Sequence, residues 1–194
     1  MKFLLVYAHP RTDSFCHALK EKVAATLAKS GHDIDVLDLY AEGFRPDMSA
    51  EERGRYNYEK TNLDGIEAYV ARLTSVDGLV FVYPTWWYGL PAILKGWFDR
   101  IWAPGVAFEI NGGVIKPLLK RVKSIHVVST MGAPWWFAWL MGHPGRLFLR
   151  LGVKSMCGRG CRFVWRAHDR MDSSTPESRA AFLAEVEKVF AKIA

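Results

Sequence analysis

The chain has 194 residues, of which 50% are hydrophobic and 24% charged, and it carries a formal net charge of +6. This length suits one α/β domain with a full core, residues 1–194, and leaves little room for two. No apolar run reaches the roughly 18 residues of a membrane-spanning helix, and His9 interrupts the apolar start before any signal-peptide cleavage site, so we expect a cytoplasmic protein without membrane insertion.

Strands and helices alternate along the chain. The apolar run at residues 2–8 is typical of a strand buried on both faces, and apolar residues at four-residue steps after Ser14 are typical of a helix that Gly31 ends. In chain order we expect a strand at 2–8, a helix at 14–30, a strand at 33–39, a polar, partly ordered excursion at 44–62, a helix at 63–75, a strand at 78–83, a helix at 91–102, a strand at 124–129, a strand near 160–165 and a closing helix at 175–194.

Five strands that alternate with helices predict a three-layer α/β sandwich around a mostly parallel sheet. We expect the strand order 2-1-3-4-5, one of the two common orders of such sheets. Ligands of these sheets bind outside the carboxyl ends of the strands, where the order reverses. The loops that begin at His9, Pro84 and Thr130 would then share one edge and form the candidate site.

The three cysteines and the surplus of basic residues favour neither a metal site nor a nucleic-acid partner. Cys157 and Cys161 are four residues apart, but no second Cys/His pair completes a zinc site, and an odd cysteine count suggests reduced thiols. Basic residues become frequent from Lys116 onward without any recognition-helix or RNA-binding motif. We expect a solvated surface that could also steer anionic cofactors.

The loop after the first strand, residues 9–16, suits a phosphate group. Its free amides at a helix N-terminus attract anions, and the hydroxyls of Thr12 and Ser14 and the charge of Arg11 would assist. No GxGxxG and no Walker sequence occurs, which excludes a dinucleotide-binding Rossmann turn and a P-loop. An ordinary capped helix start, with Asp13 or Ser14 as the cap, explains the same residues.

The loop after the third strand, residues 84–89, gives the strongest signal. It places Trp86, Trp87 and Tyr88 between a buried strand and a helix. Their amides could donate hydrogen bonds and their rings could stack, which are the needs of a planar, partly polar group such as a flavin ring. The rings could instead pack the edge of the core, but three consecutive residues of an extended loop cannot all face one core. At least one is therefore expected to face a ligand or another subunit.

The run from Val82 to Arg100 resembles the central motif of flavodoxin-like NAD(P)H:quinone oxidoreductases, the flavodoxin-2 family. The family pattern is Pro–x–x–Trp–(Phe or Tyr)–x–x–Pro, followed by a helix that reads x–Leu–Lys–Gly–Trp–Phe–(Glu or Asp)–Arg. The matching positions are Pro84, Trp87, Tyr88, Pro91, Leu94, Lys95, Gly96, Trp97, Phe98, Asp99 and Arg100.

The resemblance covers most of the chain and implies a flavodoxin-like fold. In the first loop His9, Ser14 and Phe15 match the family in type and spacing. Cys16 replaces an asparagine that, in the family, helps to hold the phosphate portion of the flavin. The similarity is weakest over 43–62 and 133–170, where the Trp-rich segment 135–139 could roof a substrate pocket or form a subunit contact.

The third loop is similar to the family's Thr–Thr–Gly–Gly, whose amides stabilise negative charge on the reduced flavin ring. Thr130 and Gly132 fit this pattern, whereas Met131 and Ala133 do not. The cofactor-binding residues that we expect are His9, Thr12, Ser14, Phe15, Cys16, Pro84, Thr85, Trp86, Trp87, Tyr88, Thr130, Met131 and Gly132.

The resemblance also implies a catalytic residue. Family members have a histidine about a dozen residues after the third loop, implicated in proton transfer, and His143 takes that place in Gly142–His143–Pro144–Gly145. The tyrosine that often shares this role is missing, so a proton relay would rest on His143 alone. Taken without the family, such a histidine is more often a surface loop residue.

The activity that the resemblance implies is a flavin-dependent NAD(P)H oxidoreductase with a quinone-like acceptor. Hydride would pass from the nicotinamide C4 to the flavin N5, and two electrons would then return to the acceptor in a ping-pong reaction. The step from His9 to Ser14 resembles the FAD-binding branch, so we expect FAD first and FMN second. Relatives are usually homodimers, which we expect here. The acceptor and the choice between NADH and NADPH stay open.

Two other classes of protein stay open. A flavin-binding regulatory or electron-transfer module would share the motif but turn over little substrate. A hydrolase on an α/β sheet would need a Gly–x–Ser–x–Gly elbow, and none occurs, since Ser14 lacks the flanking glycines.

Overall fold

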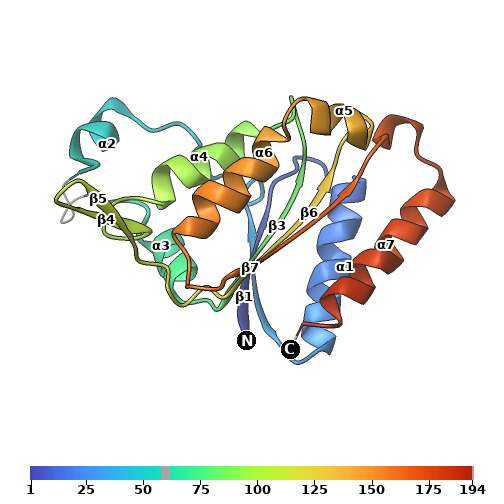
Figure 1. Ribbon diagram of the computed structural model, residues 1–194, viewed down its shortest axis with the longest axis horizontal. Helices are drawn as coiled ribbons and strands as arrows, with labels where there is room; N and C mark the ends of the chain where they lie inside the picture. The colour runs from blue at the N-terminus through green and yellow to red at the C-terminus, as the bar shows by residue number, and fades with distance from the viewer. Residues whose placement is uncertain (58–61, 194) are drawn as a thin grey trace.

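The computed structural model describes residues 1–57 and 62–193, which fold around a five-stranded parallel sheet (Figure 1). Counted over these five strands, the sheet order is 2-1-3-4-5, so the predicted α/β architecture and strand order are confirmed. In spatial order the strands are β2 (Asp33–Asp38), β1 (Lys2–Tyr7), β3 (Gly78–Pro84), β6 (Ser124–Thr130) and β7 (Arg162–His168).

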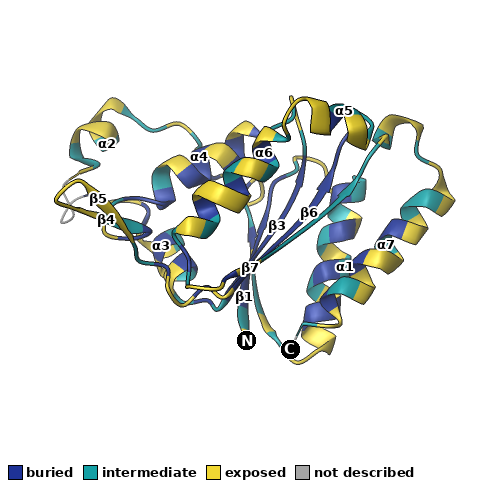
Figure 2. Cartoon of the chain, viewed as in Figure 1, coloured by how far each residue is buried: buried dark blue, intermediate teal, exposed yellow. Residues whose placement is uncertain are grey.

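Helices cover both faces of the sheet. Alternate residues of a strand point to opposite faces, so β1 contributes Leu4 and Val6 to one core and Phe3 and Leu5 to the other. The central strand β3 is buried along its whole length (Figure 2). One face carries α1 (Phe15–Lys29) and α7 (Pro176–Phe190), and the other carries α3 (Glu67–Thr74), α4 (Ala92–Ile101) and α6 (Pro144–Leu147), which continues into the π-helical turn η1 (Phe148–Val153).

Several smaller elements escaped the sequence analysis because each is too short for a periodic apolar pattern. The excursion predicted at 44–62 contains one helical turn, with Ser49 and Glu52 forming a capping box at its start. Residues 58–61 of that excursion, and Ala194 of the predicted closing helix, lie outside the described residues. The elements that were not predicted are α2 (Ala50–Arg55), β4 (Phe108–Asn111), β5 (Val114–Pro117), α5 (Trp135–Leu140), α6, η1 and η2 (Met171–Ser173).

Helix α4 holds most of the family-like motif and is packed tightly into the scaffold. Trp97 is fully buried, and a Cβ added at Gly96 would lie 2.2 Å from the carbonyl oxygen of Pro46. The Arg100 Nε donates a hydrogen bond of 3.0 Å to Glu52, so α4 also fixes the capped turn α2. Gly96 is therefore required by the close approach of another backbone.

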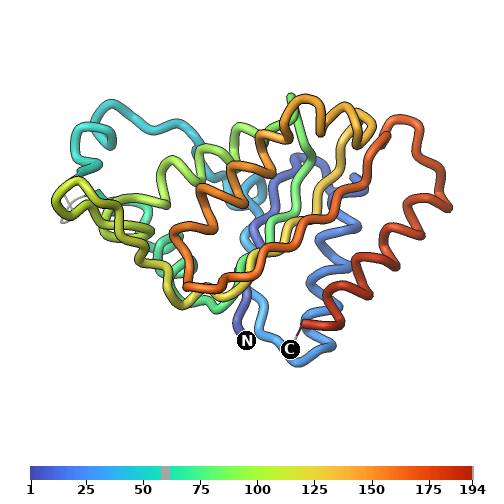
Figure 3. The backbone as a smooth tube through the Cα atoms, viewed as in Figure 1, coloured from blue at the N-terminus to red at the C-terminus, as the bar shows by residue number. Residues whose placement is uncertain are grey.

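The two ends of the described chain lie close together near the amino-terminal ends of the strands, on the opposite side of the molecule from the candidate loops (Figure 3). The His32 ring connects them, with Nδ1 3.4 Å from the Met1 amine and Nε2 3.1 Å from the Ile193 carbonyl oxygen. No helix in the described ranges has both the length and the apolar character that crossing a membrane requires.

Candidate functional site

The three loops singled out from the sequence meet at one edge of the sheet. The Ala8 N–H donates to the Val82 carbonyl at 3.1 Å, and the Thr85 N–H donates to the Thr130 carbonyl at 2.6 Å. These bonds prolong the pairing of β1 with β3 and of β3 with β6 into the loops. The prediction that the loops share an edge is confirmed at the level of the backbone.

The first loop is organised around a helix cap. Ser14 accepts a hydrogen bond from the His17 N–H at 3.1 Å and donates one to the Arg11 carbonyl at 3.0 Å. Arg11 forms an exposed ion pair with Asp13 at 2.6 Å, and this pair holds the pKa of the Asp13 carboxyl down to about 2. The ordinary capped helix start is therefore observed, with Ser14 and not Asp13 as the cap.

The remaining first-loop residues divide between the surface and the interior. Thr12 is exposed, and the His9 Nδ1 accepts from the Arg11 N–H at 3.0 Å. The ring of Phe15 packs against His168 and Phe182. In the described residues the Phe15 amide, in the first turn of α1, donates to no protein acceptor, so this turn keeps a backbone donor for an anion.

Cys16 turns inward and joins the first loop to the third. Its Sγ lies 3.2 Å from the Thr130 Oγ1, and burial raises the pKa of the thiol to about 11. The Cys16 side chain is thus a neutral link inside the fold. A contact from this residue to a phosphate would come from its backbone N–H.

The second loop makes a tight turn whose two central residues are both aromatic. The Gly89 N–H donates to the Trp86 carbonyl at 2.9 Å, while Trp87 and Tyr88 have positive φ angles of 48° and 61°. Positive φ at both central positions is the signature of type I′ turns, which favour Asn and Gly. A bulky residue in this region is strained by roughly 1–3 kcal/mol, a cost commonly found at functional sites. The Trp87 side chain is 95% exposed.

A cavity of about 200 Å³ lies between the second and third loops. In the part of the chain that the structure describes, the backbone N–H groups of Trp87, Tyr88, Gly132 and Ala133 donate to no protein acceptor. Four of its lining residues therefore carry backbone N–H groups without a protein acceptor, and two of these residues are aromatic, a composition that suits one edge of a planar, polar ring system. Its lining residues are Thr85, Trp87, Tyr88, Met131, Gly132 and Ala133.

Hydrogen bonds below this cavity fix the ends of the two strands. The Ser129 Oγ donates to the Tyr83 carbonyl at 2.8 Å and lies 2.8 Å from the Thr85 Oγ1. Pro84 and Thr130 are paired in register at the last position of β3 and β6. The Met131 N–H donates to the His168 carbonyl at 2.8 Å, so the third loop is held by both neighbouring strands.

His143 stands at a sharp junction between two helices. Gly142, with φ of 76°, follows the end of α5, its N–H donates to the Trp139 carbonyl, and the His143 N–H donates to the Ala138 carbonyl, each at 2.9 Å. These two bonds form a Schellman cap, and Pro144 then begins α6 at its first position. The sequence Gly–His–Pro thereby sets the place of the histidine, whose φ of 45° is also left-handed.

The junction at His143 touches the second loop. The Gly145 N–H donates to the Tyr88 carbonyl at 3.2 Å, and a Cβ at Gly145 would lie 3.3 Å from the Gly89 Cα. The His143 ring packs edge-on against Trp165, with centroids 6.2 Å apart. Partial burial, and secondly the charge of Arg146, lower the pKa of His143 below its ordinary value, which favours the neutral imidazole at pH 7. The structure thus brings the predicted catalytic residue beside the aromatic turn.

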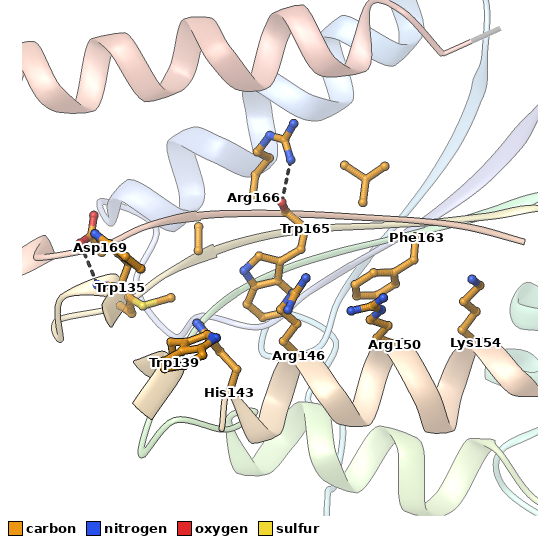
Figure 4. A pocket seen from close by; sticks show the side chains of 13 residues that line it. Trp135, Trp139, His143, Arg146, Arg150, Lys154, Phe163, Trp165, Arg166 and Asp169 are labelled. Carbon is orange, nitrogen blue, oxygen red and sulfur yellow. Dashed lines mark hydrogen bonds between the residues drawn. The ribbon is translucent and has the colours of Figure 1, made fainter. Parts of the chain in front are cut away.

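A second, larger cavity went unnoticed in the sequence. The basic trench, of about 660 Å³, lies between the α5–α6–η1 segment and the edge strand β7 (Figure 4). The even spacing of Arg146, Arg150 and Lys154 was visible in the sequence, but the helix that carries them was not predicted. Besides these three, the residues that line the trench include His143, Trp139 and Trp165.

A family model described as a flavodoxin-like fold, Flavodoxin_2, matches residues 1–188. The chain is 34% identical over 147 residues to ribosyldihydronicotinamide dehydrogenase (quinone) of Rattus norvegicus, which covers 68% of this chain and 64% of that protein. The chain therefore spans slightly less than two thirds of the length of this curated relative.

Solved structures share the fold over nearly the full chain. An NAD(P)H:quinone oxidoreductase from Methanothermobacter marburgensis is 24% identical with a TM-score of 0.87, over 100% of this chain and 99% of that one. An FMN-dependent NADH-azoreductase from Bacillus anthracis, solved in complex with FMN, is 16% identical with a TM-score of 0.80, over 98% of each chain. At these identities the likeness concerns the fold alone.

Proposed function

Because the chain belongs to the flavodoxin-2 family, we propose that it is a flavin-dependent NAD(P)H oxidoreductase that reduces a quinone-like acceptor. The observation that carries this proposal is the cavity between the second and third loops. Four of its lining residues have backbone N–H groups without a protein acceptor among the described residues, and two of the four, Trp87 and Tyr88, form the strained turn. A turn held in an unfavourable conformation with an exposed indole is explained by a ligand that stacks there.

The residues fit a flavin in two places. The amides of the second and third loops would bond the polar edge of its ring, and the free first-turn amides of α1 would bond its phosphate, with Cys16 contributing through its backbone. We propose FAD as the cofactor and FMN as the second choice, on the family resemblance of the His9–Ser14 spacing. A bound flavin would accept hydride from NAD(P)H and return two electrons to the acceptor in a ping-pong sequence.

His143 is the side chain that we propose as proton relay. Its lowered pKa favours the neutral imidazole at pH 7, the Schellman cap holds its backbone, and the Gly145–Tyr88 hydrogen bond places this junction beside the second loop. Replacing it by Asn, which tolerates the left-handed backbone, should lower kcat by about a hundredfold while the flavin is retained. An unchanged kcat in His143→Asn would remove the proposed role.

We further propose a homodimer, as is usual in the family. Large apolar side chains are exposed along α5, α6 and η1, among them Trp136, Leu140, Leu147 and Leu151. Such a surface suits the apolar centre of an interface between copies. Light scattering of the purified protein should give twice the mass of the chain, and a monomer at micromolar concentration would contradict the dimer.

The proposed activity is tested with the purified protein, NADPH or NADH, and 1,4-benzoquinone. We expect a yellow preparation, parallel double-reciprocal plots when both substrates are varied, and one quinone reduced per nicotinamide oxidised. A yellow protein with no turnover would point to the regulatory or electron-transfer module instead. A colourless protein that binds neither FAD nor FMN would contradict the proposal entirely.

A further inference from the structure

The basic trench begins at the candidate site and follows β7, the outermost strand on one side of the sheet. Figure 4 shows Trp135, Trp139 and His143 at one end and Lys154 at the other, with helix side chains facing those of β7. Met131 and His143 line the trench, and Met131 also lines the cavity between the second and third loops. One elongated ligand could therefore occupy both places.

Three positive charges follow one face of the helix that forms the trench wall. Arg146, Arg150 and Lys154 are spaced by four residues, about one helical turn per step, along α6 and η1. Like charges at this spacing repel each other. Within residues 1–57 and 62–193 no carboxylate forms an ion pair with any of the three. An uncompensated row of cations inside a concave site is explained by an anionic ligand.

The trench has an electrical polarity. Its one lining carboxylate, Asp169, lies at the end near the third loop, where it accepts a hydrogen bond from the Trp135 N–H at 3.0 Å and forms a long ion pair with Arg170 at 4.0 Å. The fourth cation of the lining, Arg166, is paired with Glu185 at 2.9 Å. Negative groups of a ligand are therefore drawn toward Arg150 and Lys154, away from Asp169. An uncharged end would lie near His143.

Aromatic rings complete the lining. Trp139 is 71% exposed, and Phe163 and Trp165 extend from β7 toward the helix that carries the cations. Such rings can stack on a nucleobase, while the cations on the opposite wall can pair with phosphates. The volume of about 660 Å³ lies within the range of small-molecule pockets, which favours a mononucleotide-sized group over a macromolecule.

We infer that the basic trench binds the adenosine bisphosphate half of NADPH. The phosphates lie along Arg146, Arg150 and Lys154, the adenine stacks on the aromatic wall, and the nicotinamide reaches the cavity beside His143. The choice of NADPH as the ligand rests on the proposed function. The inference also assigns a preference for NADPH over NADH to Arg150 and Lys154, because the 2′-phosphate would lie at the end of the trench that holds these two cations.

The direct test is calorimetric binding of adenosine 2′,5′-bisphosphate to the full-length protein. The double variant Arg150→Ala/Lys154→Ala should raise Kd at least tenfold, since hydrogen bonds to charged groups are each worth about a factor of ten or more. The control Lys120→Ala/Arg159→Ala removes two exposed cations outside the trench and should leave Kd unchanged. Equal affinity in the trench variant and the wild type would overturn the inference.

Steady-state kinetics give the second test. The ratio of kcat/KM for NADPH to that for dihydronicotinamide riboside, which lacks the bisphosphate half, should fall at least tenfold in the trench variant and stay constant in the control. A constant ratio in both variants would overturn the inference. If the wild type oxidises neither donor, the proposed function fails, and bisphosphate binding still decides whether the trench is a nucleotide site.

Discussion

The motif that identifies the family contains two regions of opposite physical character. In α4, Trp97 is fully buried and Gly96 touches the backbone of Pro46. In the turn just before it, Trp87 is 95% exposed and both central residues have positive φ. Most matching residues therefore serve the scaffold, and the chemistry depends on the few that packing does not require. A sequence match over α4 indicates the fold, whereas the turn carries the evidence for a ligand.

The largest effect should come from the buried tryptophan. Trp97→Ala should lower the free energy of unfolding by about 3–5 kcal/mol, because it leaves a cavity in the core. Urea denaturation measures this, with Trp87→Ala as the matched control. Since the Trp87 indole is almost fully exposed, its removal should change stability by less than about 1 kcal/mol. Comparable losses of unfolding free energy in the two variants would contradict the distinction between a scaffold tryptophan and a site tryptophan.

Two histidines, His126 in the scaffold and His143 in the candidate site, extend the comparison of the two regions to the pH dependence of stability. Burial, and secondly the charge of Arg162, lower the pKa of His126 on the scaffold strand β6 from 6.5 to about 4. Between these values the unfolded chain binds the proton and the folded protein does not. Stability from this group is thus complete above pH 6.5 and falls as pH decreases toward 4, by roughly 3 kcal/mol in all.

The contribution of His126 is measured as the difference in unfolding free energy between the wild type and His126→Leu across that window. The wild type should lose more stability than the variant on acidification. His143→Asn, in the candidate site, should depart from the wild-type curve less than His126→Leu does, because His143 is only partly buried. Parallel curves for the wild type and His126→Leu would refute the assignment.

Two glycines of the same motif should differ by a smaller amount. Gly96→Ala should cost about 1–3 kcal/mol, because its Cβ meets the fixed backbone of Pro46. Gly89→Ala is the control, since its nearest contact would be 3.8 Å away and its φ is not positive. Thermal unfolding should show a lower Tm for the first variant only, and equal Tm values would show that the close approach at Gly96 is not rigid.

The smallest change in stability should come from relieving the strained turn. Trp87→Gly should leave the free energy of unfolding unchanged or raise it by up to about 1 kcal/mol, because glycine adopts positive φ without a steric cost. The same variant should lose flavin on gel filtration. A variant that is less stable but keeps its flavin would contradict this assignment, because the turn would then serve stability and not ligand binding.

The sequence predicted what depends on local pattern. The buried strands followed from apolar runs, the capped helix start from the cap-forming residues Asp13 and Ser14, and the meeting of three loops at one edge from a general rule of parallel sheets. The positive φ angles of Trp87 and Tyr88 could not be foreseen, because aromatic residues disfavour them. The inward turn of Cys16 toward Thr130 also depends on tertiary packing.

The basic trench was missed for a different reason. Its cations lie on a helix that begins after two left-handed residues and passes into a π-helical turn, so no regular apolar period marks it. Its other wall is the edge strand β7, whose position beside that helix is a property of the folded sheet. The spacing of the three cations can be read from the sequence, but the opposite wall of the trench, formed by β7, cannot.

Hydrogen–deuterium exchange with and without added FAD or FMN tests the central claim most directly. Exchange should slow at the amides of Trp87, Tyr88, Gly132 and Ala133 when flavin is present, while α4, already protected by burial, should not change. Binding of either flavin without protection of these four amides, or no saturable binding of both, would contradict the account.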